Sequence, residues 1–131
     1  MLVLVSRKIL VYVETGSSRD VEKYSDGSRV IVRATYGNKH RALKLYGVPD
    51  DDLDFTLSFL KECNELNVEK CIAIVRDERI AHLIDEYLVK KYPHLLSKVI
   101  VVKIPFLSRK EEIINTLEEA IQKLSNNIAM N

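Results

Sequence analysis

The run Cys71-Ile72-Ala73-Ile74-Val75 decides the fold class of this 131-residue chain. Five apolar residues stand in a row between charged neighbours, which is typical of a strand buried on both faces. A second buried strand is predicted over Val99–Ile104. Between the two, Glu78–Lys91 has apolar residues at helical spacing, and Pro93 ends that helix because the residue before a proline disfavours helical angles. Strand, helix and strand together predict a right-handed crossover in a sheet covered by helices.

Two further helices flank this unit. Pro49-Asp50-Asp51-Asp52 opens the first, because proline fits the first turn and carboxylates favour the positive N-terminal end of a helix. Ser108-Arg109-Lys110-Glu111 has the spacing of a capping box and opens the second. The polar end of the chain, residues 126–131, is expected to be a loose tail, so that residues 1–125 form a single domain.

The first third of the chain has the composition of β-strands. Leu2–Val5 and Ile9–Val13 form either a hairpin or one long bent strand. Val21–Tyr24 and Arg29–Thr35 flank the sequence Ser25-Asp26-Gly27-Ser28, whose Asp-Gly pair predicts a β-hairpin. We therefore expect a single α/β domain with a mixed five-stranded sheet flanked by helices. The expected order, β-β-β-α-β-α-β-α, is that of the ribonuclease H-like architecture.

The composition excludes several classes of protein. No run of roughly eighteen apolar residues is present, so neither a transmembrane helix nor a membrane partner is expected. The N-terminus also lacks the features of a signal peptide. Cys63 and Cys71 lack C-x-x-C spacing, and with three scattered histidines they predict reduced core thiols and no metal site of the zinc type. The chain is therefore expected to be cytoplasmic, and its richness in Lys, Glu, Ile and Val favours a thermophilic source.

Charge is distributed unevenly along the chain. Residues 1–48 carry nine Lys or Arg against four Asp or Glu, a net charge of +5, whereas the remainder is net −4. Such an asymmetry favours an acidic partner such as nucleic acid, although a salt-bridged β-surface explains it as well. Basic and aromatic side chains gather in the linker between the last N-terminal strand and the first long helix. The residues expected to contact RNA phosphates or bases are Arg33, Tyr36, Lys39, His40, Arg41 and Lys44.

Several segments resemble the central domain of Pelota and of the class-1 translation release factors of archaea and eukaryotes. The residues that carry the resemblance are Gly37-Asn38-Lys39-His40-Arg41-Ala42, Val68-Glu69-Lys70-Cys71-Ile72 and Lys91-Tyr92-Pro93, followed by the strand from Lys98. The resemblance implies a ribonuclease H-like fold that associates with RNA or the ribosome during translation rescue or termination, without a cofactor. Ala42–Tyr46 stands where release factors have Gly-Gly-Gln, so peptidyl-tRNA hydrolysis is not expected. Whether the chain is a domain of a longer protein or a free-standing relative stays open.

A metal-dependent nuclease is the second hypothesis. Such enzymes need several carboxylates that converge on Mg²⁺ or Mn²⁺, because the metal ions clamp the attacking and leaving oxygens. Asp77 follows a buried strand, at the edge where open α/β sheets bind ligands. The candidate catalytic carboxylates are Glu14, Asp54 (or Asp52), Asp77 and Glu119. No glycine-rich phosphate loop and no nucleophile motif is present to suggest another reaction.

A protein-interaction or assembly module is the third hypothesis. An exposed edge of the N-terminal strands would pair with a protein partner or with a second copy of the chain. Natural edge strands are usually guarded by charges, and Arg19, Lys23 and Arg29 are suited to that role.

Overall fold

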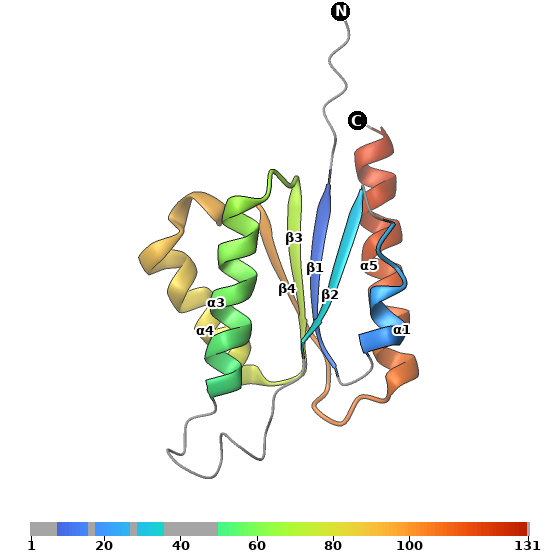
Figure 1. Ribbon diagram of the computed structural model, residues 1–131, viewed down its shortest axis with the longest axis horizontal. Helices are drawn as coiled ribbons and strands as arrows, with labels where there is room; N and C mark the ends of the chain where they lie inside the picture. Colours follow the sequence, from blue (N-terminus) through green and yellow to red (C-terminus); the bar gives the residue numbers. More distant parts are fainter. Residues whose placement is uncertain (1–7, 16–17, 27–28, 36–49, 131) are drawn as a thin grey trace, which may run out of the picture.

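The structure is a computed structural model that describes residues 8–15, 18–26, 29–35 and 50–130 (Figure 1). Helices alternate with strands along these residues. The elements are β1 (Ile9–Glu14), α1 (Ser18–Glu22), β2 (Val30–Thr35), α3 (Asp50–Glu65), β3 (Lys70–Val75), α4 (Glu78–Lys91), the 3-10 turn η1 (Pro93–Leu95), β4 (Val99–Lys103) and α5 (Lys110–Met130). The single α/β domain is confirmed. Helix α5 continues through most of the segment 126–131 that the sequence predicts to be a tail.

The sheet has the order β2-β1-β3-β4, and every neighbouring pair is parallel. Two parts of the sequence-based prediction are therefore wrong. The described sheet has four strands instead of five, and it is all-parallel instead of mixed. The β-β-β start expected for a ribonuclease H-like order is replaced by β-α-β. Leu2–Val5 lies outside the described residues.

The N-terminal error has a local cause. Val21 belongs to helix α1 and is fully buried, whereas the sequence predicts a strand over Val21–Tyr24. Parallel strands cannot be joined by a two-residue hairpin, so the connection from β1 to β2 must cross over the sheet, and α1 provides that crossing. Asp26, expected in the hairpin turn, instead accepts hydrogen bonds from the backbone N–H of Arg29 (2.7 Å) and Val30 (3.0 Å). Asp26 thereby shapes the entry into β2.

Two helical layers cover the sheet, α3 and α4 on one face and α1 and α5 on the other (Figure 1). Alternate residues of β1 supply the two cores, because successive side chains of a strand point to opposite faces. Leu10 and Tyr12 pack beneath α3 and α4, where Tyr12 meets the rings of Phe55 and Phe59 at centroid distances of 5.8 and 5.3 Å. The other face is aliphatic, with Val11 and its neighbours packed against α1 and α5.

The position of each strand in the sheet sets its burial. β1 and β3 are central and almost wholly buried. β4 lies at an edge and is only half-buried, with Ile100 37% exposed, so the prediction of a buried strand over Val99–Ile104 is wrong in that respect. Within the described sheet the edge strands are β2 and β4. The strand Ile9–Glu14 is therefore not available as an edge for a partner.

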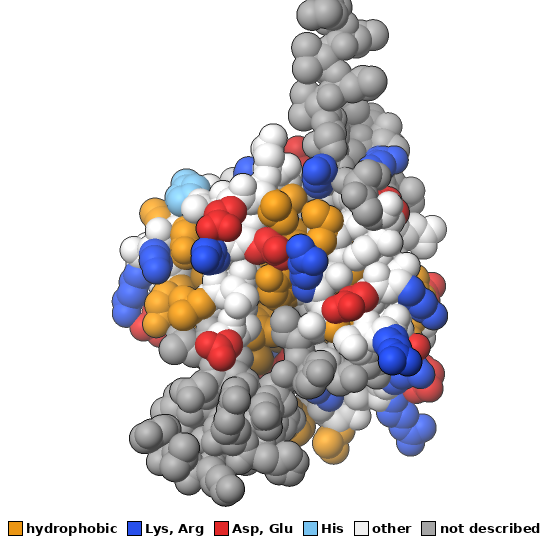
Figure 2. Space-filling model, viewed as in Figure 1, with side chains coloured by type: hydrophobic (Ala, Val, Ile, Leu, Met, Phe, Trp, Pro, Cys, Tyr) orange, Lys and Arg blue, Asp and Glu red, His pale blue; other side chains and the backbone are white. Residues whose placement is uncertain are grey.

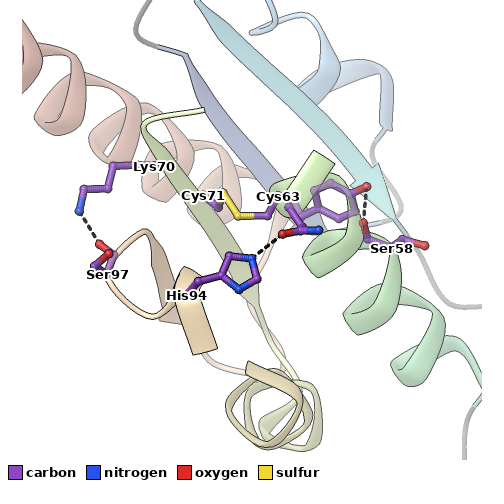
Figure 3. Close-up of a disulfide and its surroundings, with 8 residues drawn as sticks. Ser58, Cys63, Lys70, Cys71, His94 and Ser97 are labelled. Atoms are coloured by element: carbon purple, nitrogen blue, oxygen red, sulfur yellow. Dashed lines mark hydrogen bonds between the residues drawn. A yellow bond between two sulfur atoms is a disulfide. The ribbon is translucent and has the colours of Figure 1, made fainter. Parts of the chain in front are cut away.

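A disulfide joins Cys63 to Cys71, which corrects the prediction of reduced thiols (Figure 3). Cys63 lies near the end of α3 and Cys71 near the start of β3, with their Cα atoms 6.1 Å apart and eight residues of sequence separation. The bond ties the last turn of a helix to the strand that it precedes. Disulfides are typical of oxidising compartments and of intracellular proteins from hyperthermophiles, so the cysteines no longer support a cytoplasmic location. Within the described part of the chain, no helix has both the length and the apolar character needed to cross a bilayer.

Candidate functional site at the carboxyl edge of the sheet

The connections between strands lead to opposite sides of β1, so the sheet has a topological switch point between β1 and β3. The chain passes from β1 to β2 on one side and then returns to place β3 on the other side of β1. In open α/β sheets, ligands bind outside the carboxyl ends of the strands at such a point. Here β1 ends at Glu14, and β3 is followed by Arg76 and Asp77. These three residues define the candidate site, which lies at the lower end of the sheet in Figure 1.

Glu14 is the best-positioned side chain of this site. It is only 7% exposed, and its Oε1 accepts hydrogen bonds from the backbone N–H groups of Arg76 (2.6 Å) and Asp77 (3.0 Å). Hydrogen bonds to an ionised acceptor are stronger than neutral ones, so both N–H groups hold the carboxylate in place. Oε2 receives no hydrogen bond from the described residues, so one oxygen of a fixed carboxylate is left available to a ligand.

Asp77 begins helix α4. Its backbone is extended, and its Oδ1 accepts the N–H of Arg79 at 2.9 Å, as an N-cap residue does. The Arg79 guanidinium also meets Oδ2 of Asp77 at 2.9 Å. The carboxylate is thus shared between the helix start and an arginine, and a metal ion would have to displace that arginine.

Arg76 was not singled out from the sequence. Its Nε is the one buried side-chain nitrogen or oxygen of the described residues that has no hydrogen-bond partner. A buried donor without an acceptor lowers stability, so its presence beside Glu14 requires a reason. The sequence feature that could have identified Arg76 is its position directly after a strand predicted to be buried on both faces, at the edge where open α/β sheets bind ligands.

The four carboxylates predicted for a nuclease do not form one cluster. Glu14 and Asp77 lie together, whereas Asp54 belongs to α3 and Glu119 to α5, on opposite faces of the sheet. Among the described residues, no group of three or more His, Cys, Asp or Glu side chains is placed to hold a metal ion. The structure therefore brings two of the four predicted residues to one place.

The residues predicted to contact RNA fall into two groups. Arg33 lies on β2 and forms a two-pronged ion pair with Glu62 of α3, with Nε–Oε1 and Nη2–Oε2 both at 3.0 Å. The Glu62 hydrogen bond raises the pKa of Arg33 above its ordinary value, and its guanidinium is committed to the fold. The other five lie outside the described residues: Tyr36, Lys39, His40, Arg41 and Lys44.

The point at which this basic segment leaves the sheet is nevertheless fixed. Thr35, the last residue of β2, pairs with Glu14 in the parallel register. The sequence that continues from Thr35 therefore starts at the carboxyl edge, next to the candidate site. On the described surface visible in Figure 2, Lys and Arg side chains alternate with Asp and Glu, so a broad basic face is not seen there.

Comparison with known proteins yields no relative. No protein-family model, no curated protein and no solved structure matches the chain at a significant level. The site geometry and the sequence are thus the grounds on which its function is inferred.

Proposed function

We propose that the protein is an RNA-associated α/β domain that binds phosphates at the carboxyl edge of its sheet. The observation that carries the proposal is the parallel pairing of Thr35 with Glu14. This pairing brings Thr35, the residue that precedes the basic segment in the sequence, to the edge that also holds Arg76. The resemblance to translation-rescue and release-factor domains favours tRNA or rRNA as the acidic partner.

The mechanism is electrostatic. Asp77 is paired with Arg79 and Glu14 is held by two backbone N–H groups, so the positions of both carboxylates on this edge are fixed. Arg76 retains a donor without an acceptor, and guanidinium groups bind phosphate oxygens with strong, directional hydrogen bonds. Lys39, Arg41 and Lys44 then add sequence-independent contacts whose strength falls as salt rises.

Titration of labelled tRNA at two salt concentrations tests this function. Replacement of Lys39, Arg41 and Lys44 by alanine is expected to weaken binding and to reduce the slope of log affinity against log salt by about 2 units. The matched control replaces Lys61, Lys91 and Lys98, which removes the same charge from α3, from the end of α4 and from the turn before β4. No binding at low salt, or equal losses in the two triple variants, would refute the proposal.

A Mg²⁺-dependent nuclease is the second candidate function. Its candidate catalytic carboxylates are reduced to Glu14 and Asp77. The 3.0 Å contact between Glu14 Oε1 and the Asp77 N–H favours it, because it places two carboxylate residues side by side. Mg²⁺ commonly takes one or two carboxylates and completes its shell with waters and substrate phosphates. Glu14 would supply the first carboxylate, and Asp77 would supply a second only after the ion displaces Arg79. When bound, the ion would polarise a phosphoryl oxygen. Glu14 would hold the ion through Oε2, and Arg76 would orient the phosphate.

Incubation with RNA, DNA and an RNA–DNA hybrid in Mg²⁺ or Mn²⁺ tests this candidate. Glu14→Gln and Asp77→Asn are each expected to abolish cleavage, whereas Asp54→Asn and Glu119→Gln serve as controls that retain it. Cleavage that survives Glu14→Gln assigns the activity to other residues or to a contaminant.

A further inference from the structure

The turn that follows β4 lies at the same edge as the candidate site. Because β4 is parallel to β3, its carboxyl end meets the edge where Arg76 lies. The backbone N–H of Ile104 donates to the carbonyl of Val75 at 2.9 Å, which continues the pairing one residue beyond β4. Figure 1 shows the connection from β4 to α5 at the end of the sheet where α4 begins. The residues after Ile104 are thus neighbours of the proposed phosphate site.

This turn presents apolar side chains to solvent. Phe106 is 52% exposed and Leu107 is 86% exposed, whereas Phe55 and Phe59 are almost completely buried. Isolated exposed apolar residues are ordinary on protein surfaces. Two consecutive ones beside a candidate ligand site are more informative, because exposed apolar surface at such a place usually marks a contact.

The turn is held in one shape. The N–H of Ser108 donates to the carbonyl of Pro105 at 3.0 Å, which closes a four-residue β-turn with Phe106 and Leu107 at its two central positions. The Ser108 hydroxyl donates to the same carbonyl at 2.6 Å, and Ser108 is itself buried. A contact surface fixed in advance loses less conformational entropy when it binds.

The charges around the turn select the class of ligand. Lys103 pairs with Glu78 at 2.8 Å and Lys110 pairs with Asp20 at 3.1 Å, so both lysines are neutralised within the fold. Arg109, which follows the turn directly, is exposed, and its side chain has no ion pair or hydrogen bond with the described residues. An aromatic ring beside an available cation is the combination that proteins use for single-stranded nucleic acid, where the ring stacks on a base and the cation meets a phosphate.

We infer that the turn Pro105–Ser108, with Arg109, is a base-contacting element for single-stranded RNA whose phosphates lie at the Arg76 site. The inference rests on the proposed RNA association and adds the part of the ligand that is recognised. The ring of Phe106 stacks on one nucleobase, Leu107 covers its edge, and Arg109 binds the adjoining phosphate. Since Glu111 and Glu112 follow on α5, the cationic contact is confined to Arg109, and stacking carries most of this element's affinity.

Fluorescence anisotropy with two matched oligonucleotides tests the inference. One is a 12-nucleotide single-stranded RNA, and the other is an abasic oligomer with the same number of phosphates. Phe106→Ala is expected to weaken binding of the RNA at least about fivefold without changing its salt dependence, and to leave the abasic oligomer unaffected. Phe106→Tyr, which keeps a stacking ring, restores binding. Leu96→Ala is the control, since Leu96 is a comparably exposed apolar side chain after η1.

The possible outcomes distinguish a failure of the proposed function from a failure of the inference alone. If the wild-type chain binds neither oligomer, the proposed function and the inference both fail. If it binds both and Phe106→Ala changes nothing, the inference fails and the proposed function stands. Equal losses on the two oligomers would also overturn stacking. Self-association that disappears in Phe106→Ala would assign the turn to a contact between copies of the chain and would overturn the inference.

Discussion

The two ends of the sheet are built differently. At the amino edge the Cys63–Cys71 disulfide fastens α3 to β3, and Lys70 Nζ donates to the Ser97 carbonyl at 2.9 Å (Figure 3). His94 Nε2 meets Asn64 Oδ1 at 2.6 Å nearby. At the carboxyl edge Arg76 keeps a buried donor without a partner. The amino edge is closed by covalent and hydrogen bonds, whereas the carboxyl edge holds a buried donor without a partner among the described residues and the exposed side chain of Leu107.

Under the proposed function, this difference means that stability and ligand binding are placed at opposite ends of the same strands. A site that binds ligands must keep donors, acceptors and apolar surface available, and each of these lowers stability when no ligand is present. The amino edge supplies compensating stability without touching the site. Disulfide reduction and two variants test that separation, and they follow in decreasing order of the expected loss of stability.

Reduction of the disulfide is expected to give the largest loss, because it removes a constraint on the unfolded chain. For a loop of this length the entropic estimate is about 2.5 kcal/mol of unfolding free energy. Denaturant unfolding followed by circular dichroism, with and without reductant, measures the change. RNA binding by the reduced, folded protein should be unaltered. The variant with both Cys63→Ala and Cys71→Ala is the control, since its stability should not respond to reductant.

Glu14→Ala probes the carboxyl edge. Its removal leaves the N–H groups of Arg76 and Asp77 without their carboxylate, and the expected loss of stability is about 2 kcal/mol. Glu14→Gln keeps an acceptor oxygen and should lose less. The same denaturant measurements apply. A more stable Glu14→Ala protein would mean that the carboxylate is retained for function at the expense of the fold.

Tyr12, on β1 between the two edges, is expected to give the smallest effect. Burial raises the pKa of its hydroxyl well above the ordinary value, and the nearby Glu62 raises it further. Since the folded-state pKa exceeds the unfolded one, this contribution is complete below about pH 10 and is lost as the pH rises above that value. The loss is up to about 1.4 kcal/mol per pH unit, and Tyr12→Phe should remove this part of the alkaline sensitivity. Equal pH profiles for the two proteins between pH 9 and about 11 would contradict it.

The sequence indicated most of the second half of the fold. The helices Asp50–Glu65 and Glu78–Lys91 and the strand Lys70–Val75 follow patterns long or regular enough to be recognised locally. The first third is predicted less well, because the β-rich composition of Val21–Tyr24 predicts a strand although the three-residue spacing of its two ends also fits a helix. Tyr24 packs on the α5 face, and its hydroxyl donates to Glu118 at 2.8 Å. That contact joins residues 94 positions apart and is invisible to a local pattern.

The site was predicted only in part, for the same reason. Asp77 was placed at the carboxyl edge from the strand before it, and Glu14 was named as a candidate. Their meeting depends on β1 pairing with β3, which no local pattern specifies. The disulfide was missed because Cys63 and Cys71 become neighbours only when α3 packs on β3.

The strand order also has a consequence for the newly made chain. β2 pairs beside β1, β3 then takes the opposite side of β1, and β4 joins the outer side of β3. Each strand therefore attaches to an open side of a sheet that already exists, and none has to be inserted between two earlier strands. Domains can fold as they emerge during synthesis. This order allows each strand to join the sheet in the sequence in which the ribosome synthesises it. The Cys63–Cys71 bond can form once β3 has been synthesised and has paired with β1.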